Sequence, residues 1–308
     1  MTVGILGVVI LAAIAVFVVA AGKREPKTAA HASPQTGAPV PNPSGGQGHD
    51  LQKQLKALLY ADQTLKDELL SMVQFSPEIK QALALLEKGE CPEALRQANA
   101  DETLPPETRS LLLAHVKAAC GDQAGAVAEL RKDLATVEGA AADQGQSHSI
   151  LQTWFRLRQL GVQPETMTAM RTLGVIVEMG FPEGTNTIAG YADGSSRHFT
   201  RQGGGIAGPE RRPEVQEAAR QLVDAAQTFV KSAQSLQDRN VKPGIVRFTF
   251  LTPGGPLASE TTTEEIQAGT SPLMPLFAMA GQLSMLKNQG YGPSSAPGPS
   301  TNQQPANH

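Results

Sequence analysis

The chain has 308 residues, with 26 Lys and Arg against 29 Asp and Glu, so its formal net charge is −3 at pH 7. With no basic excess and only 4% aromatic residues, the composition argues against a nucleic-acid-binding protein. The chain carries no Walker loop, HExxH, GxSxG or kinase signature, and no Cys and His spacing typical of a zinc site. We therefore expect no catalytic residue, no metal site and no cofactor.

The first 22 residues are predicted to form a transmembrane anchor. Residues 3–21 read VGILGVVILAAIAVFVVAA, an uncharged run long enough to cross the hydrocarbon core of a bilayer as a helix. A signal peptide cleaved after residues 19–21 is the main alternative, and a buried core helix is a weaker one. Basic residues follow the run at 23–27 and none precedes it, so the positive-inside rule predicts a single-pass protein whose remaining chain faces the cytoplasm.

Two polar segments frame the rest of the chain. Residues 23–49 and 290–308 are rich in Pro, Gly and Ser and poor in large apolar side chains, so they are predicted to be a disordered stalk and a disordered tail. The composition between them changes from Ala- and Leu-rich to Gly- and Thr-rich near residue 180. This change predicts a helical-hairpin domain at 50–162 and an α+β domain at 163–289.

The helical half contains two similar hairpins. Residues 82–95 (ALALLEKGECPEAL) match residues 114–127 (AHVKAACGDQAGAV) after a shift of about 32 positions. The equivalent pairs include Gly89 with Gly121 and Ala94 with Ala126. In each copy the Gly is suited to end the first helix in a left-handed conformation, and the small Ala lets the second helix pack closely.

This pattern, over residues 77–138, resembles the tetratricopeptide repeat. The resemblance implies two helical hairpins, followed by a helix at 148–160 that could cap the stack, and a concave surface for a protein partner. An ordinary helical bundle with two similar turns is the alternative.

The two cysteines, Cys91 and Cys120, lie next to the two hairpin turns. Stacked hairpins could bring them together, in which case a disulfide would form in an oxidising compartment. Two separate buried thiols are the alternative, because Cys is common among small buried residues. Both interpretations stay open.

The second half is predicted to be a small antiparallel sheet with helices packed on one face. The expected elements in chain order are a hairpin over 184–201, a helix over 214–238, strands over 245–251 and 257–262, and a helix over 264–287 that is interrupted near Ser271-Pro272 and Pro275. The expected fold class of the whole chain is thus α+β: a transmembrane helix, an all-α helical-hairpin region and this antiparallel α/β domain.

A Gly-rich loop follows the predicted hairpin. Its GxGxxG pattern, beginning at Gly203, lacks the apolar strand, the adjacent helix and the acidic residue that a dinucleotide site needs, so a flexible loop is the better interpretation. The surrounding arginines support a weak anion-binding candidate, with a solvated charged edge as the alternative. The candidate residues are Arg201, Gly203, Gly204, Gly205 and Arg211.

Taken together, these features predict a membrane-anchored interaction or scaffold protein with a partner-binding helical region. Its partners would be the membrane, through residues 3–21, and another protein. The alternative function is a ligand-sensing or nucleotide- or anion-binding domain around residues 203–208.

Overall fold

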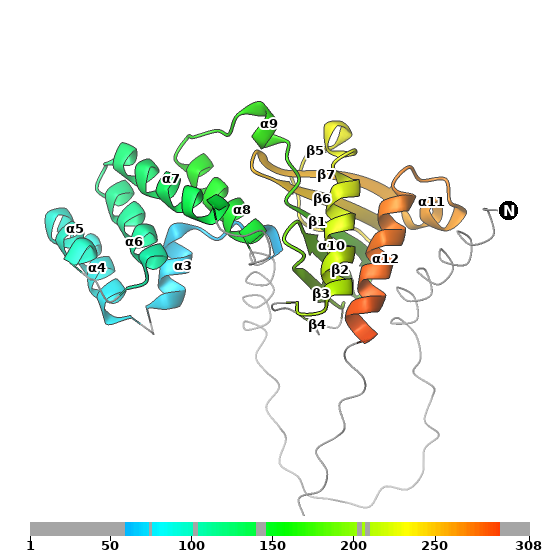
Figure 1. Ribbon diagram of the computed structural model, residues 1–308, viewed down its shortest axis with the longest axis horizontal. Helices are drawn as coiled ribbons and strands as arrows, with labels where there is room; N and C mark the ends of the chain where they lie inside the picture. The colour runs from blue at the N-terminus through cyan, green and yellow to red at the C-terminus, as the bar shows by residue number, and fades with distance from the viewer. Residues whose placement is uncertain are drawn as a thin grey trace, which may run out of the picture.

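The structure is a computed structural model (Figure 1). It describes residues 59–73, 76–100, 104–139, 146–201, 205–206 and 210–289. A stack of helices comes first in the chain, and an antiparallel sheet with its own helices follows (Figure 1). The expected stalk at 23–49 and tail at 290–308 lie outside the described residues.

The prediction of a transmembrane fold class is corrected. A crossing helix needs about 20 mostly apolar residues. Among the described residues no helix is long and apolar enough to cross a membrane. The longest of them, α7 at Gln123–Gly139, has 17 residues and includes charged ones. The apolar run at 3–21 lies outside the described residues, so the predicted single-pass membrane localisation, with the domains in the cytoplasm, is not supported.

The helical stack begins with α3, whose first turn is capped by the side chain of Thr64, and continues with α4, capped by Ser76. Its helices are α3 (Leu65–Met72), α4 (Pro77–Glu87), α5 (Cys91–Ala100), α6 (Pro106–Ala119), α7 (Gln123–Gly139), α8 (Gln146–Gln159) and the short α9 (Thr166–Ala169). Helices α4 and α5 pack as one hairpin and α6 and α7 as the next, and α8 packs on α7 (Figure 1).

The two hairpin turns are locally equivalent. Gly89 and Gly121 follow the first helix of each hairpin with φ angles of 76° and 86°, a conformation that favours Gly. Ala94 and Ala126 are fully buried at the start of the second helices. Small side chains at these positions allow the paired helices to approach closely.

The second part of the chain is built on a seven-stranded antiparallel sheet with the order β4-β3-β2-β1-β6-β7-β5. Its strands are β1 (Gly174–Phe181), β2 (Gly184–Tyr191), β3 (Ser196–Phe199), β4 (Gly205–Ile206), β5 (Gln234–Ser235), β6 (Ile245–Thr252) and β7 (Gly255–Thr262). Its helices are α10 (Pro213–Ala226), a 3-10 turn at Val230–Ser232, α11 (Thr263–Ala268) and α12 (Met274–Gln289). The central strand β1 was not among the elements expected from the sequence.

The sheet is covered on both faces, whereas helices were expected on one face only. One face packs against α10 and α12, through side chains such as Val177, Phe248 and Phe277. The other face contributes Ile176 and residues of its neighbouring strands to a second core, shared with residues 59–61 and α8. Burial of seven consecutive residues of β1 on both faces explains why the strand shows no alternation of polar and apolar residues.

Candidate functional site

The segment at residues 59–64 joins the helical stack to the second face of the sheet. Tyr191, which is fully buried on β2, donates from its hydroxyl to the carbonyl oxygen of Leu59 over 2.8 Å. The hydroxyl of Tyr60 donates to Oε2 of Glu178 on β1 over 3.0 Å. The guanidinium of Arg239, in the loop before β6, lies 4.3 Å from the centroid of the Tyr60 ring. This segment therefore inserts one aromatic side chain between a carboxylate and a guanidinium.

The side chains of Tyr60, Glu178 and Arg239 form a polar row, and a buried arginine on β6 extends it. Arg247 on β6 lies opposite Glu178 in the strand register. Its Nε donates to Glu260 over 2.7 Å, and its terminal nitrogens donate to the carbonyl oxygens of Asp238 (2.7 Å) and Asn240 (3.0 Å). Burial and the charge of Glu178 raise the pKa of Tyr60, which keeps its phenol protonated as a donor. The row therefore suits a structural role better than proton transfer.

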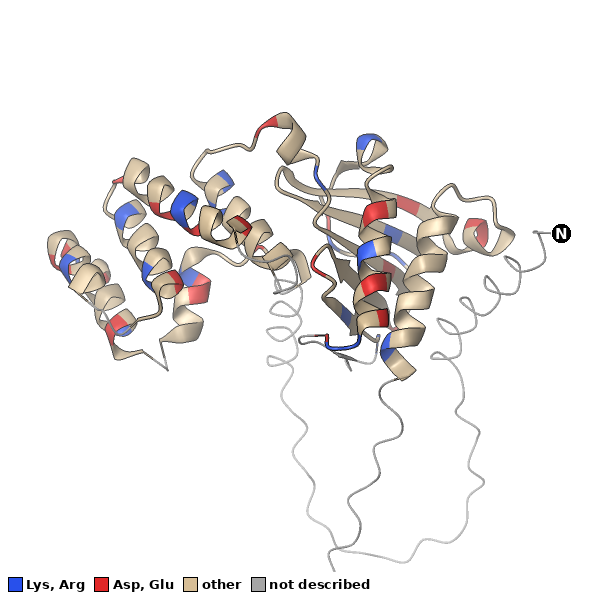
Figure 2. Cartoon of the chain, viewed as in Figure 1, with Lys and Arg blue, Asp and Glu red and all other residues tan. Residues whose placement is uncertain are grey.

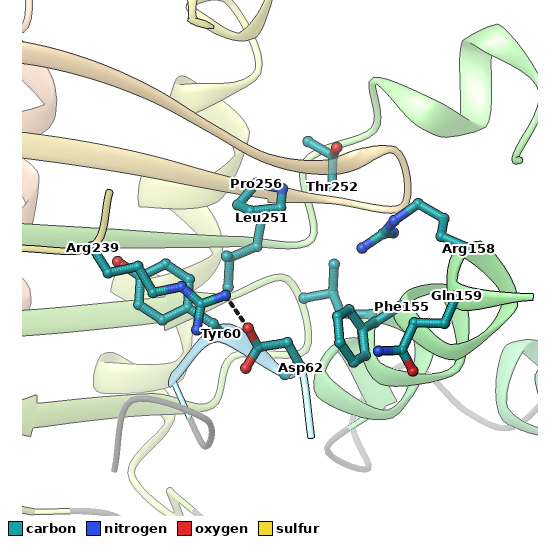
Figure 3. A pocket seen from close by; sticks show the side chains of 11 residues that line it. Tyr60, Asp62, Phe155, Arg158, Gln159, Arg239, Leu251, Thr252 and Pro256 are labelled. Atoms are coloured by element: carbon teal, nitrogen blue, oxygen red, sulfur yellow. Dashed lines mark hydrogen bonds and ion pairs between the residues drawn. The ribbon is translucent and has the colours of Figure 1, made fainter. Parts of the chain in front are cut away.

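Beside this row is a cleft of about 260 Å³ between α8 and the hairpin of β6 and β7, which we name the junction cleft. Figure 3 shows its side chains arriving from three separate parts of the chain: the 59–64 segment, α8, and the region from the β5–β6 loop to β7. The lining residues are Tyr60, Ala61, Asp62, Leu151, Phe155, Arg158, Gln159, Arg239, Leu251, Thr252 and Pro256.

Three charged side chains determine the electrostatics of the junction cleft. Asp62 forms an ion pair with Arg239. Arg158 donates to the carbonyl oxygen of Pro253, and its guanidinium lies 6.0 Å from the centroid of the Phe155 ring. Burial lowers the pKa of Arg158, although the charge of Asp62 opposes this shift. Two guanidiniums and one carboxylate therefore lie in a partly desolvated cleft.

The structure describes only part of the anion site predicted around the Gly-rich loop. Arg201 lies 3.4 Å from the Glu183 carboxylate and 4.9 Å from the centroid of the Phe181 ring. Gly203 and Gly204 lie outside the described residues, and of Gly205 only the backbone, in β4, is described. Arg211 is exposed, and its backbone N–H donates to Glu210 over 3.1 Å.

A carboxylate occupies the end of this loop. Glu210 pairs with Arg212 (3.1 Å) and with the buried Lys287 (3.3 Å), and Lys287 also donates to the carbonyl oxygen of Ser196 over 2.8 Å. The arginine and lysine nearest the start of α10 are therefore already neutralised from within the chain. Figure 2 shows basic and acidic residues interspersed along the described helices and strands, and among the described residues no group of metal-ligating side chains is found.

Cys91 and Cys120 form a disulfide, with their Cα atoms 5.7 Å apart. The bond joins the first residue of α5 to the residue that follows α6. It therefore ties one hairpin of the stack to the next.

The junction cleft was missed by sequence reasoning. Asp62 and Arg239 are 177 residues apart, with Arg158 between them in the chain, and the three belong to no spacing motif, so only the docking of α8 on the sheet brings them together. Comparison with protein-family models, with curated proteins and with solved structures finds no match for this chain.

Proposed function

We propose that this chain is an interaction or scaffold protein in which the two hairpins formed by α4 to α7 present the partner-binding surface. Figure 1 shows these hairpins projecting away from the sheet, while α8 lies next to it. Stacked helical hairpins bury their core between neighbours and leave extended surfaces for partners.

The contacts that attach α8 to the sheet support the view that the hairpins form a rigid arm. The backbone N–H of Ser147, at the start of α8, donates to the Asp193 carboxylate over 2.8 Å, and the Asp193 N–H donates back to the Ser147 hydroxyl over 3.0 Å. At the other end of the helix Arg158 donates to the Pro253 carbonyl oxygen. A helix held at both ends fixes the orientation of the hairpins that pack on it, so a partner would meet a preorganised surface.

The observation that carries the proposal is a set of half-buried leucines on the outermost hairpin. Four leucines on α4 and α5 are half-buried: they pack against the apolar core of the stack, beside exposed polar residues such as Lys80, Gln81 and Arg96. These leucines are Leu83, Leu85, Leu86 and Leu95. The part of these side chains that reaches the surface, at the end of a projecting stack, offers apolar area for a partner to cover.

The disulfide indicates the kind of compartment in which this surface functions. Disulfides between Cys residues persist in oxidising compartments and are rare in the cytosol. We therefore propose that the helical stack functions in an oxidising compartment, in place of the cytoplasmic location expected from the flanking charges. The bond between Cys91 and Cys120 would keep α5 and α6 together when the partner binds.

Site-specific crosslinking of the full chain tests the proposal. The photoreactive residue p-benzoylphenylalanine would replace Leu83 or Leu95 on the outer hairpin, and Gln221 on the exposed side of α10 as the control, in cells that make the protein. We expect a discrete protein adduct from the two leucine positions and none from Gln221. Absence of adducts at both leucines, or the same adducts at Gln221, would contradict the proposal.

A further inference from the structure

The junction cleft has both cationic and apolar walls. Figure 3 shows the side chains of Arg158 and Arg239 reaching it from opposite sides, one from α8 and the other from the loop before β6. Phe155 and Leu251 lie between them, and Leu251 is almost fully buried. The space between the two guanidiniums is therefore bordered by apolar carbon.

The charges in the junction cleft are unequal. Asp62 neutralises Arg239 through an ion pair. For Arg158, the described residues offer a main-chain carbonyl oxygen, that of Pro253, and no carboxylate in an ion pair. A guanidinium has five N–H donors, so one carbonyl acceptor leaves several of them for another group. One positive charge in a partly desolvated cleft thus lacks a matching anion from the described chain.

The size of the junction cleft limits what could occupy it. Its volume of about 260 Å³ is below the roughly 300–1,000 Å³ of sites for drug-sized molecules, so it suits a group no larger than about one amino-acid residue. A carboxylate matches the fork of a guanidinium in bidentate geometry, and unlike an inorganic anion it can be carried on an apolar side chain that fits the apolar wall. Gln159 at the edge of the cleft adds a side-chain amide that can donate or accept.

We propose that the junction cleft binds a carboxylate carried on a small apolar body, with Arg158 as its principal partner. The same chemistry could come from a free apolar acid or from the last residue of a peptide that ends in an apolar side chain. This proposal does not depend on the partner surface on α4 and α5, because the junction cleft is formed by other residues.

Isothermal titration of the full chain with two matched pairs of probes tests the proposal. One pair is N-acetylphenylalanine and its amide; the other is a six-residue peptide ending in Phe, with a free or an amidated C-terminus. We expect the acids to bind at least tenfold more tightly than the amides, because only the acids can form charge-assisted hydrogen bonds with Arg158. A peptide that binds tenfold more tightly than N-acetylphenylalanine would identify a peptide C-terminus as the source, and equal affinities would identify a free acid.

Substitutions assign the binding to this cleft. Arg158→Gln keeps a donor for the Pro253 carbonyl oxygen but removes the charge, and should weaken binding of the acid at least tenfold. The matched control Arg131→Gln, on an exposed part of α7, should leave binding unchanged. Asp62→Asn removes the internal competitor for Arg239 and should tighten binding several-fold, a gain that partial unfolding cannot mimic.

Several outcomes would overturn the proposal. They are an absence of binding by both acids, equal affinities of acids and amides, and an affinity of the Arg158→Gln chain equal to that of the unmodified chain. An equal loss in the Arg131→Gln chain, or weaker binding by the Asp62→Asn chain, would also overturn it. None of these measurements reports on crosslinking at Leu83, so the two proposals can fail separately.

Discussion

The Tyr60 hydroxyl donates a 3.0 Å hydrogen bond to the Glu178 carboxylate, although the two residues lie 118 positions apart in the chain. Tyr60 belongs to the segment that leads into the helical stack, and Glu178 to the central strand of the sheet. Both side chains are almost fully buried, so the bond is made away from water. This contact is one of the polar links that hold the two parts of the molecule together.

Removal of this link should destabilise the chain as a whole. Tyr60→Phe leaves a buried carboxylate without its phenol donor and should lower the free energy of unfolding by about 1–3 kcal/mol. Urea denaturation of Tyr60→Phe, Glu178→Gln and the double variant measures the coupling between the two side chains. A double variant whose loss equals the sum of the two single losses would show that the bond contributes nothing.

The disulfide should stabilise the helical stack. It spans 29 residues, for which the loss of chain entropy in the unfolded state predicts a contribution of about 3.5 kcal/mol. Reductant should therefore lower the melting temperature of the unmodified chain and increase hydrogen exchange in α4 to α6. The Cys91→Ala/Cys120→Ala chain is the control, because it should already have the lower melting temperature and should not respond to reductant. An unmodified chain that melts at the same temperature with and without reductant would contradict the prediction.

Helix α3 should depend on one ion pair with α8. Glu68 on α3 pairs with Arg156 on α8, whose side chain is 3% exposed, and burial lowers the pKa of that arginine to about 10. Glu68→Ala would leave the guanidinium buried without its carboxylate, which costs about 3–5 kcal/mol. We expect faster hydrogen exchange across Leu65–Met72 in this variant. The exposed Glu138→Ala on α7 should leave exchange in α3 unchanged, and an equal effect of both substitutions would refute a specific role of the pair.

Glu210 should make stability depend on acid pH. Burial by itself would raise the pKa of this carboxyl, but the hydrogen bonds from Arg212 and the charge of Lys287 lower it from 4.5 to about 2. A folded-state pKa below the unfolded one means that the stabilisation is fully present above about pH 4.5 and is lost as the pH falls toward about 2.

Glu210→Gln tests this dependence. The difference in urea midpoint between the unmodified and Glu210→Gln chains should be largest near neutral pH and shrink through this acid window. Glu214→Gln, an exposed carboxylate at the start of α10, serves as the control and should show no such trend. A difference that stays constant with pH would exclude Glu210 as the titrating group.

Several strands and turns could be read from the sequence because their signals are local. The two Gly turns, at 89 and 121, depend on a backbone conformation that Gly adopts most easily, and the strand at 245–251 depends on its own β-branched and aromatic residues. β1 also contains β-branched residues, but GVIVEMGF is mostly apolar without alternation because both faces of the strand are buried, and the period of such a run does not distinguish it from a buried helix.

One predicted helix was too long. The apolar period over 214–238 continues past Ala226, where α10 ends, because Val230 is fully buried in a 3-10 turn that packs on the same core. The helix predicted over 264–287, with an interruption near Ser271-Pro272 and Pro275, is indeed divided: α11 ends before Gly269, which has a φ angle of 68°, and α12 begins at Met274. Hydrophobic periodicity reports which side chains are buried, and it does not report which backbone conformation buries them.

The sequence by itself determined the near-balanced charge, the two similar helical hairpins and the strands around residue 250, since each of these follows from composition or from neighbouring residues. Only the tertiary structure decided that the sheet is covered on both faces and that Cys91 meets Cys120. It alone placed Asp62, Arg158 and Arg239 around one cleft. The physical reason is that these contacts join segments far apart in the chain, and their positions depend on how α8 packs on the sheet, which no local pattern encodes.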